Sequence, residues 1–437
     1  MVCTSSSPPG ASLPAQPAAR RATVAPTARA REVRLVVVMG EPRCSLGGRQ
    51  AGVAREGCRP RRAVSKTGDI ARAPADPRGM ANASWRLLEV APDPAGSSPG
   101  WAHEGVAALD RAVCVARDGH DDQAVRAVES ANRLAHQEDS AHTLVVALDD
   151  ADTVVGRLGV DLPLRGNRHT AWVEVQVHPD HRRRGLGAAL LERGERVAAD
   201  AGRGTLQAES EFRESPGSPP LLPPTGSGAA PADDAGVRFA RAHGYELAQV
   251  DRRSLLETPV APGLLDALEA DAAGRTGGYR LHRWDSTVPE RWLDAFALLE
   301  TRMSTDAPVG ALDFREDPWD AERVRRMAAR QVEQGREYVI TAAEHVASGE
   351  LAGMTMLAWL PAQQCAFQWD TIVLAPHRGH RLGMAMKVAN LRHLAALRPD
   401  VRRVHTWNAE ENDHMLGINV AMGFRPAGGA AIWQRLT

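Results

Sequence analysis

The chain of 437 residues has a formal net charge of −1 and is long enough for two or three domains. Residues 1–79 carry 14 basic and 5 acidic residues, so the remainder holds a charge of about −10, which excludes a general nucleic-acid binder. Acidity of the body favours a cationic substrate, although solubility explains it equally. No apolar run reaches the roughly 18 residues that span a bilayer, so we expect no membrane association.

The five cysteines show neither paired nor metal-ligand spacing, and no cluster of histidine, cysteine and carboxylate side chains has the spacing of a metal site. Reduced thiols are typical of the cytoplasm, where we expect the protein to reside. We expect no metal ion.

Residues 1–79 are rich in Ala, Arg, Pro, Ser and Gly and show no sustained periodicity. Such a composition cannot bury enough apolar surface to offset chain entropy. An organelle transit peptide has a similar composition, but the preference for Arg over Lys runs through the whole chain. Regular patterning begins with "MANASWRLLEV", so we expect the natural start near Met80 and a disordered or spurious tail before it.

The elements of a first unit, residues 80–258, follow in order. Residues 121–137 place apolar side chains at helical spacing, and 142–163 form two alternating runs around a polar turn, which predicts a β-hairpin. "AWVEVQV" (171–177) predicts a third strand. The Pro-, Gly- and Ser-rich residues 211–236 predict a surface excursion, after which a short helix, a glycine turn and a strand complete the unit.

A second unit, residues 279–437, repeats this order after a predicted linker at 259–278. It contains a predicted hairpin, then a strand, basic loop and helix, then a strand, short helix and Gly-Phe turn, at residues 337–360, 365–397 and 401–426. One folding unit is therefore present twice. We expect a monomer that is an internal pseudo-dimer.

A basic glycine loop follows the third strand of the first unit. It consists of Arg182, Arg183, Arg184, Gly185, Leu186, Gly187 and Ala188, and it leads into an amphipathic helix. Free N–H groups at a helix start favour phosphate, glycine permits close approach, and arginine adds charge-assisted contacts. The loop lacks the Lys-Ser/Thr of a nucleotide P-loop and the G-x-G-x-x-G of a dinucleotide site.

This R-x-x-G-x-G/A loop after a "V-x-P" strand end resembles motif A of the GNAT acyltransferases. Both units also contain a Gly-aromatic turn, at Gly244-Tyr245 and Gly423-Phe424. The resemblance extends over residues 80–437, which are much like the tandem GNAT proteins of high-GC bacteria, with mycothiol synthase as a distant relative. It implies an α/β fold (an α+β mixed, splayed sheet) with two tandem GNAT acyl-CoA N-acyltransferase domains.

The resemblance also implies a co-substrate, acetyl-CoA. Its pyrophosphate would lie on the first basic loop, and its pantetheine would pair with backbone groups near Val175 and Val177. In the second unit the corresponding residues are Val373, Arg378, Gly379, Arg381 and Gly383. Arg381 replaces the first glycine of the motif, so it either pairs with phosphate or fills the site.

Asn412 belongs to a group of asparagines in a region where related proteins contact the coenzyme or the loop backbone, although helix capping explains it more simply.

Three carboxylates are candidates for the general base. Glu174 and Asp370 each lie eight residues before the first arginine of a loop, on the strand that meets the thioester in the GNAT family, and Glu209 lies on the next strand. Each is alternatively a solvent-facing carboxylate of an alternating strand. Ala240 and Asn419 occupy the position at which many GNAT enzymes place a tyrosine acid.

The sequence therefore predicts an N-acetyltransferase that moves an acetyl group from acetyl-CoA to a primary amine of a small molecule or peptide. Transfer would occur by direct attack in a ternary complex. The alternative is a catalytically silent acyl-CoA sensor or scaffold, which the missing tyrosines and Arg381 favour.

Overall fold

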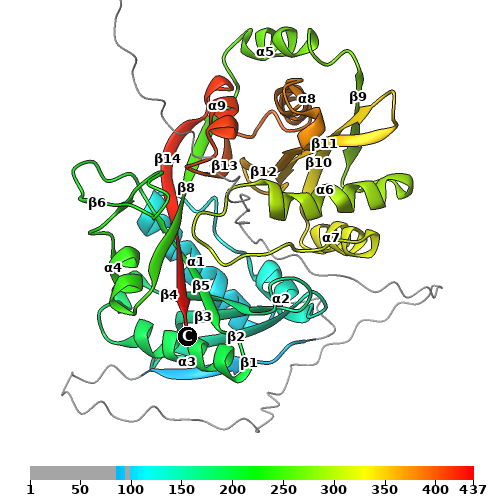
Figure 1. The fold of residues 1–437 in the computed structure, drawn as a ribbon. Coiled ribbons are helices and arrows are strands. Elements are labelled where there is room, and N and C mark those ends of the chain that lie inside the picture. Colours follow the sequence, from blue (N-terminus) through cyan, green and yellow to red (C-terminus); the bar gives the residue numbers. More distant parts are fainter. Residues whose placement is uncertain (1–84, 94–98) are drawn as a thin grey trace, which may run out of the picture.

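Figure 1 shows the fold of the protein, a computed structural model that describes residues 85–93 and 99–437. The predicted tail at 1–79 and the predicted start near Met80 lie outside the described residues. Within the described ranges, none of the helices is long and apolar enough to cross a membrane.

The first half of the chain forms an antiparallel meander followed by a parallel crossover. Its elements are β1 (Arg86–Val90), α1 (Trp101–Asp118), α2 (Ala127–Ala135), β2 (Ser140–Leu148), β3 (Val154–Pro163), β4 (Thr170–Val177), α3 (Leu186–Asp200), β5 (Thr205–Phe212), α4 (Ala235–Ala242) and β8 (Glu246–Glu257). The predicted hairpin at 142–163 is confirmed by the antiparallel β2–β3 pair. The excursion at 211–236 carries only a short ribbon, β6 (Pro220–Leu221) and β7 (Ala230–Pro231).

The second half repeats the order of the first. Its elements are α5 (Leu264–Ala273), β9 (Tyr279–Asp285), α6 (Leu293–Asp306), α7 (Ala321–Glu333), β10 (Glu337–His345), β11 (Glu350–Trp359), β12 (Cys365–Val373), α8 (Leu382–Leu397), β13 (Arg403–Ala409), α9 (Asp413–Ala421) and β14 (Arg425–Leu436). The segment predicted as a linker, 259–278, contains α5, whose Leu265 and Leu268 pack against the core beneath α8.

All strands but β6 and β7 join one sheet of twelve, in the order β1-β2-β3-β4-β5-β14-β8-β13-β12-β11-β10-β9. The two halves exchange their last strands at its centre, because β14 inserts between β5 and β8 of the first half, and β8 pairs with β13 of the second (Figure 1). Trp433 of β14 is fully buried in the first half's core, and its Nε1 donates to Ser210 Oγ at 2.8 Å. The predicted linker at residues 259–278 therefore separates the two halves in sequence, but one continuous sheet joins them.

Each half opens a wedge where two parallel strands diverge. β4 and β5 pair only from Thr170–Trp172 to Thr205–Gln207, and β12 and β13 pair only from Cys365–Phe367 to Arg403–His405. Beyond these residues the facing edges of the strands have no ladder partner. Each wedge lies beside the loop that leads into α3 or α8.

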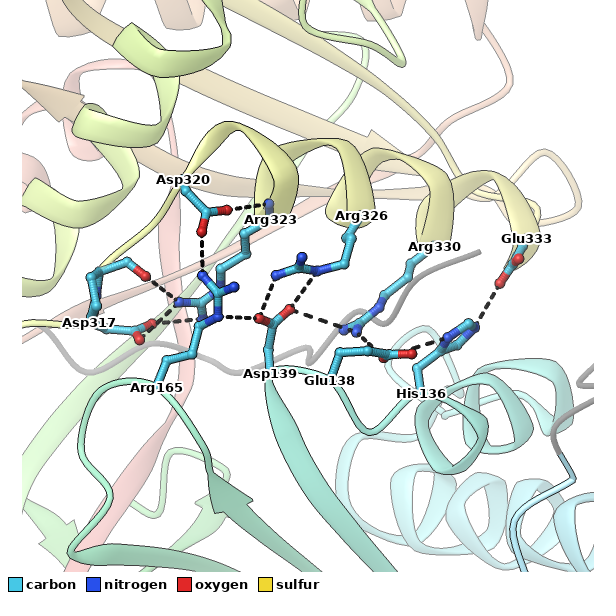
Figure 2. Close-up of polar contacts among 11 residues, drawn as sticks. His136, Glu138, Asp139, Arg165, Asp317, Asp320, Arg323, Arg326, Arg330 and Glu333 are labelled. Carbon is cyan, nitrogen blue, oxygen red and sulfur yellow. Dashed lines mark hydrogen bonds and ion pairs between the residues drawn. The ribbon is translucent and has the colours of Figure 1, made fainter. Parts of the chain in front are cut away.

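A polar network joins α7 of the second half to the segment between α2 and β2 of the first (Figure 2). Asp139 lies at its centre, with Arg326 Nη2 at 2.6 Å and Arg165 Nε at 2.9 Å. Arg330, whose side chain is 2 % exposed, pairs with Glu138 at 3.4 Å. Because these cations are withdrawn from water, their stability depends on the carboxylates that face them.

We expect Asp139→Asn to lower the free energy of unfolding by about 3–5 kcal/mol, because it leaves buried arginines without their shared counter-charge. Denaturant titration measures this change. Glu290→Gln is the matched control, since Glu290 pairs with Arg325 of the same helix but is 77 % exposed, and such pairs contribute about 0–1 kcal/mol. Equal losses in the two variants would show that the buried network adds no more than a surface pair.

Candidate active site

The loop between β4 and α3 is shaped by backbone conformation and by two arginine contacts. Gly185, the N-cap of α3, has φ +86°, and Arg183 has φ +63°. Arg182 Nε donates to Val177 O at 3.1 Å, and Arg184 Nη2 donates to Asp180 O at 2.9 Å. No side chain caps the start of α3, so its first-turn N–H groups face outward at the positive end of the helix dipole.

The two glycines of this loop serve different purposes. A Cβ on Gly185 would meet only the ring of Trp85 at 3.7 Å, so the positive φ, not space, favours glycine there. A Cβ on Gly187 would lie 3.3 Å from the ring of Phe239, so glycine allows the helix to approach α4 closely.

A cavity of about 1500 Å³ extends from this loop into the first wedge. Of the predicted residues, those that line it are Glu174, Val175, Val177, Arg182, Arg183, Gly185, Gly187, Ala188 and Glu209. Leu186 instead lies in the core, and Arg184 is exposed beside the cavity. The volume is ample for a ligand of coenzyme size, since typical pockets hold about 300–1,000 Å³.

Glu174 is held between two arginines. Its Oε2 lies 3.1 Å from Arg133 Nη1 and 3.3 Å from Arg157 Nη1. Burial opposes ionisation, but the charges of Arg157 and Arg133 outweigh it and hold the pKa of Glu174 below its usual value. A carboxylate in this setting accepts a proton poorly and serves mainly to anchor the two cations.

Glu209 has the opposite environment. It lies on β5 just past the point of divergence and lines the cavity, and within the described ranges it has no hydrogen bond or ion pair. Burial, followed by the negative charges of Glu211 and Asp251, raises the pKa of Glu209 well above its usual value. Glu211, two residues along the same face, is paired with Arg117. Of the two predicted carboxylates in the first wedge, Glu209 is therefore the one better suited to take a proton.

The second wedge holds a cavity of about 610 Å³, lined by Asp370, Val373, Arg378, Gly383 and Asn412 among the predicted residues. The loop repeats the first one's backbone contact, because Arg378 Nε donates to Val373 O at 3.0 Å. Both of its predicted cations are already paired, however, since Arg378 lies 2.8 Å from Asp306 and Arg381 lies 2.9 Å from Asp271.

Arg381 adopts φ +58° at the position of Gly185, so the loop keeps its shape despite the substitution. Its side chain turns to α5 rather than into the cavity. Asn412 accepts from Met415 N at 3.2 Å and caps α9. Gly379, at φ +87°, provides the preceding turn.

The second wedge also differs in its acid–base groups. Glu209 lies two residues past the last paired residue of β5, and the residue at the same place on β13 is Trp407. Asn419, at the expected tyrosine position, accepts from Lys387 Nζ at 2.7 Å. Burial lowers the pKa of Lys387 to about 7. Asp370 lines the cavity from β12.

Sequence reasoning missed one titratable group. Asp251 of β8 is 7 % exposed, and burial together with Glu411 and Glu410 raises its pKa to about 8. In the sequence, Asp251 is only a carboxylate in the interior of a long strand. The same pattern is equally consistent with a solvent-facing residue, so it did not mark Asp251 as buried.

Comparisons with known proteins agree with this geometry. A sequence profile of the acetyltransferase (GNAT) family matches residues 111–212, which include the first basic loop and Glu209. No curated protein matches the chain. A tandem GNAT protein from the clavulanic acid biosynthesis pathway, solved without AcCoA, is similar in structure, with 27% identity over 81% of this chain and 98% of its own, at a TM-score of 0.60.

A GCN5-related N-acetyltransferase from Sphaerobacter thermophilus is 18% identical over 80% of this chain and 95% of its own, with a TM-score of 0.51. The predicted fold class is confirmed: the chain has a mixed α/β fold with a mixed sheet, and a tandem GNAT protein is among its structural neighbours. The first half carries the GNAT acetyltransferase domain that the profile recognises, which supports an acyltransferase.

The difference between the two loops predicts where acetyl-CoA binds. Arg183→Ala in the first loop should raise the dissociation constant roughly tenfold or more, because a charge-assisted phosphate contact contributes about 1.5–3 kcal/mol. Arg378→Ala, the control in the paired second loop, should change it little. Calorimetric titration of acetyl-CoA into each protein measures both values. One coenzyme per chain that is lost only in Arg378→Ala would reverse the assignment.

Proposed function

We propose that the protein transfers an acetyl group from acetyl-CoA to a primary amine of a small molecule or peptide, and that the first half carries out the reaction. The observation that carries this proposal is Glu209, an unpaired carboxylate of raised pKa in the wedge beside the basic loop. The GNAT family match over the same segment supports it.

Two features of the first wedge suit two parts of acetyl-CoA, the pyrophosphate and the pantetheine. The N–H groups at the start of α3, together with Arg182 and Arg183, fit the pyrophosphate. Beyond Trp172 the β5-facing edge of β4 is unpaired, so its backbone near Val175 and Val177 can pair with the amides of pantetheine as an added strand would. The thioester would then lie between the diverging strands.

The reaction needs a neutral amine next to the thioester carbonyl. Glu209 takes a proton from the acceptor ammonium, and the free amine attacks the carbonyl carbon. The C–S bond breaks as the tetrahedral intermediate collapses, and the second amine proton passes through water to the thiolate, since Ala240 offers no acid. No acyl-enzyme forms, and holding both reactants in one wedge supplies much of the acceleration.

A catalytically silent acyl-CoA sensor is the second candidate, and the second half favours it. There Trp407 takes the position of Glu209, and both predicted loop cations are paired. In the described part of the first half, the loop arginines lack the carboxylate partners that Arg378 and Arg381 have, and Glu209 is present. Both features argue against a silent sensor there. Release of free thiol from acetyl-CoA that depends on an added amine separates the two candidates.

Glu209→Gln should lower kcat by about 10²–10⁴, the usual contribution of a general base. In the native protein kcat/KM should rise as pH rises through the elevated pKa of Glu209, because only the carboxylate accepts a proton. That limb should disappear in Glu209→Gln. Steady-state rates across pH, with thiol release as the readout, measure both effects.

Glu211→Gln is the matched control on the same strand face. It removes a negative charge that raises the pKa of Glu209, so the rising limb should move to lower pH while activity persists. The other groups that face Glu209, namely Asp251, Glu174 and Arg117, remain in place. A Glu209→Gln protein that keeps the native pH limb would remove Glu209 from the mechanism.

A further inference from the structure

The cavity of the second wedge continues across the centre of the sheet into the first half. Its walls combine aromatic rings with carboxylates: Trp172 of β4, Trp369 of β12, Trp407 of β13 and Phe314 of the α6–α7 loop lie around it. Trp172, Trp369 and Trp407 also line the first cavity, so the two spaces meet at these rings. The two cavities are therefore adjacent at these three residues.

Three buried acceptor atoms in this region have no hydrogen-bond partner in the described part of the chain. They are Asp251 Oδ1, Glu411 Oε2 and Gln249 Oε1. The amide nitrogen of Gln249 donates to Glu411 Oε1 at 2.7 Å and to Pro308 O at 3.1 Å, which fixes the amide orientation and leaves its oxygen unsatisfied. Asp251 and Glu411 line the cavity directly.

Burial of unsatisfied acceptors costs free energy, and native proteins avoid it. Here no neighbouring side chain relieves it. Arg253 lies two residues along β8, but its Nη2 already donates to Asp118 Oδ1 at 2.6 Å and to Ala427 O at 2.7 Å. Arg252 binds Glu410 at 2.6 Å. What this cluster lacks is a donor that carries positive charge.

The backbone register leaves room for such a donor. Asp251 lies between Ala409 on β13 and Ala430 on β14, whose side chains are short, and it lines the cavity. Burial next to Glu411 and Glu410 raises the pKa of Asp251 to about 8, as expected for a carboxylate whose counter-charge is not part of the chain.

We propose that this cavity binds the ammonium group of an organic cation through the carboxylates of Asp251 and Glu411. A primary ammonium has three N–H donors and no acceptor, and the two carboxylates that line the cavity offer it acceptors and negative charge. The surrounding indole rings favour an organic cation over a bare metal ion, because their faces attract ammonium groups and their bulk is apolar.

The position of the cluster extends the inference to the acceptor, a step that rests on the proposed transferase function. Glu209 is in register with Ile432, which is in register with Gln249. Two strand spacings place Glu209 and Gln249 about 10 Å apart. Asp251 lies two residues farther along β8, about 12 Å from Glu209 between the two backbones, and an acceptor with two amino groups can present one to each carboxylate. The structure thus points to diamines or larger polyamines.

The first test is binding, without coenzyme. Calorimetric titration of the full chain with 1,4-diaminobutane, with spermidine and with butylamine compares two charges with one. We expect both polyamines to bind more tightly than butylamine. Asp251→Asn should weaken spermidine binding tenfold or more, since it removes a charge-assisted contact. Asp200→Asn, which removes an exposed charge at the end of α3, is the control and should leave binding unchanged.

Thermal unfolding without ligand keeps the test valid if a variant is poorly folded. Because Asp251→Asn replaces a buried carboxyl that lacks a partner within the described residues with an amide of similar size, it should melt no lower than the native protein, and spermidine should raise the melting temperature of the native protein only. Glu411→Gln is the second variant, and it should show the same loss of the spermidine shift.

Each further outcome decides one of the two proposals. Spermidine binding that depends on Asp251, without any acetyl transfer, keeps the ammonium site and overturns the transferase. Transfer to butylamine and 1,4-diaminobutane with equal kcat/KM, and with a ratio that Asp251→Asn does not change, keeps the transferase and overturns the ammonium site. Binding of calcium or potassium with the same dependence on Asp251, and no binding of spermidine, also overturns it.

Discussion

The exchange of β8 and β14 at the centre of the sheet is the constraint on which the rest of the structure depends. Each half obtains a strand of its core from the other half of the chain: Trp433 of β14 is buried among first-half residues such as Leu190, and Leu256 of β8 lies in the core under α8. Separation of the halves would expose both cores at once. The walls of the central cavity are therefore held at fixed distances, as a binding site requires.

The exchange also places charged side chains where neither half alone would bring them together. Glu209 stands on β5 and Asp251 on β8, and only the inserted β14 separates their strands. The like charge of Asp251 contributes to the raised pKa of Glu209. Glu174, two strands from β14, is instead neutralised by Arg133 and Arg157. Similar carboxylates thus acquire opposite proton affinities from their partners, and the functional difference follows from that.

Local pattern predicts much of this fold. The hairpins, the basic loops and the repeat are encoded by alternation, glycine spacing and proline position, which act over a few residues, and these were correctly predicted. The strand exchange was not predicted, because alternation shows which face of a strand is buried and not which strand lies beside it. The helix α5 within the predicted linker was missed for a related reason, since its few apolar residues acquire a partner only when α8 is present.

The basic loop that we propose for the coenzyme was visible in the sequence, and the environments of the carboxylates were not. A phosphate loop is made of consecutive residues, so its chemistry is visible in the chain. The role of a carboxylate depends on neighbours that are distant in sequence: Arg133 and Arg157 neutralise Glu174, whereas Glu209 has only like charges near it. Asp271 and Asp306, which pair with the second loop, are likewise remote from it in sequence.

The two halves differ at the same two places, the start of the helix after the basic loop and the point where the strands diverge. The first half keeps glycine at the helix start and a carboxylate at the divergence of its strands, and the second has Arg381 and Trp407 at the same places. Trp407 and Trp369 nevertheless line the first cavity as well as their own. Side chains of the second half therefore form part of the wall of the first cavity. Because the sheet is continuous, the second half can shape the cavity of the first even where its own residues differ.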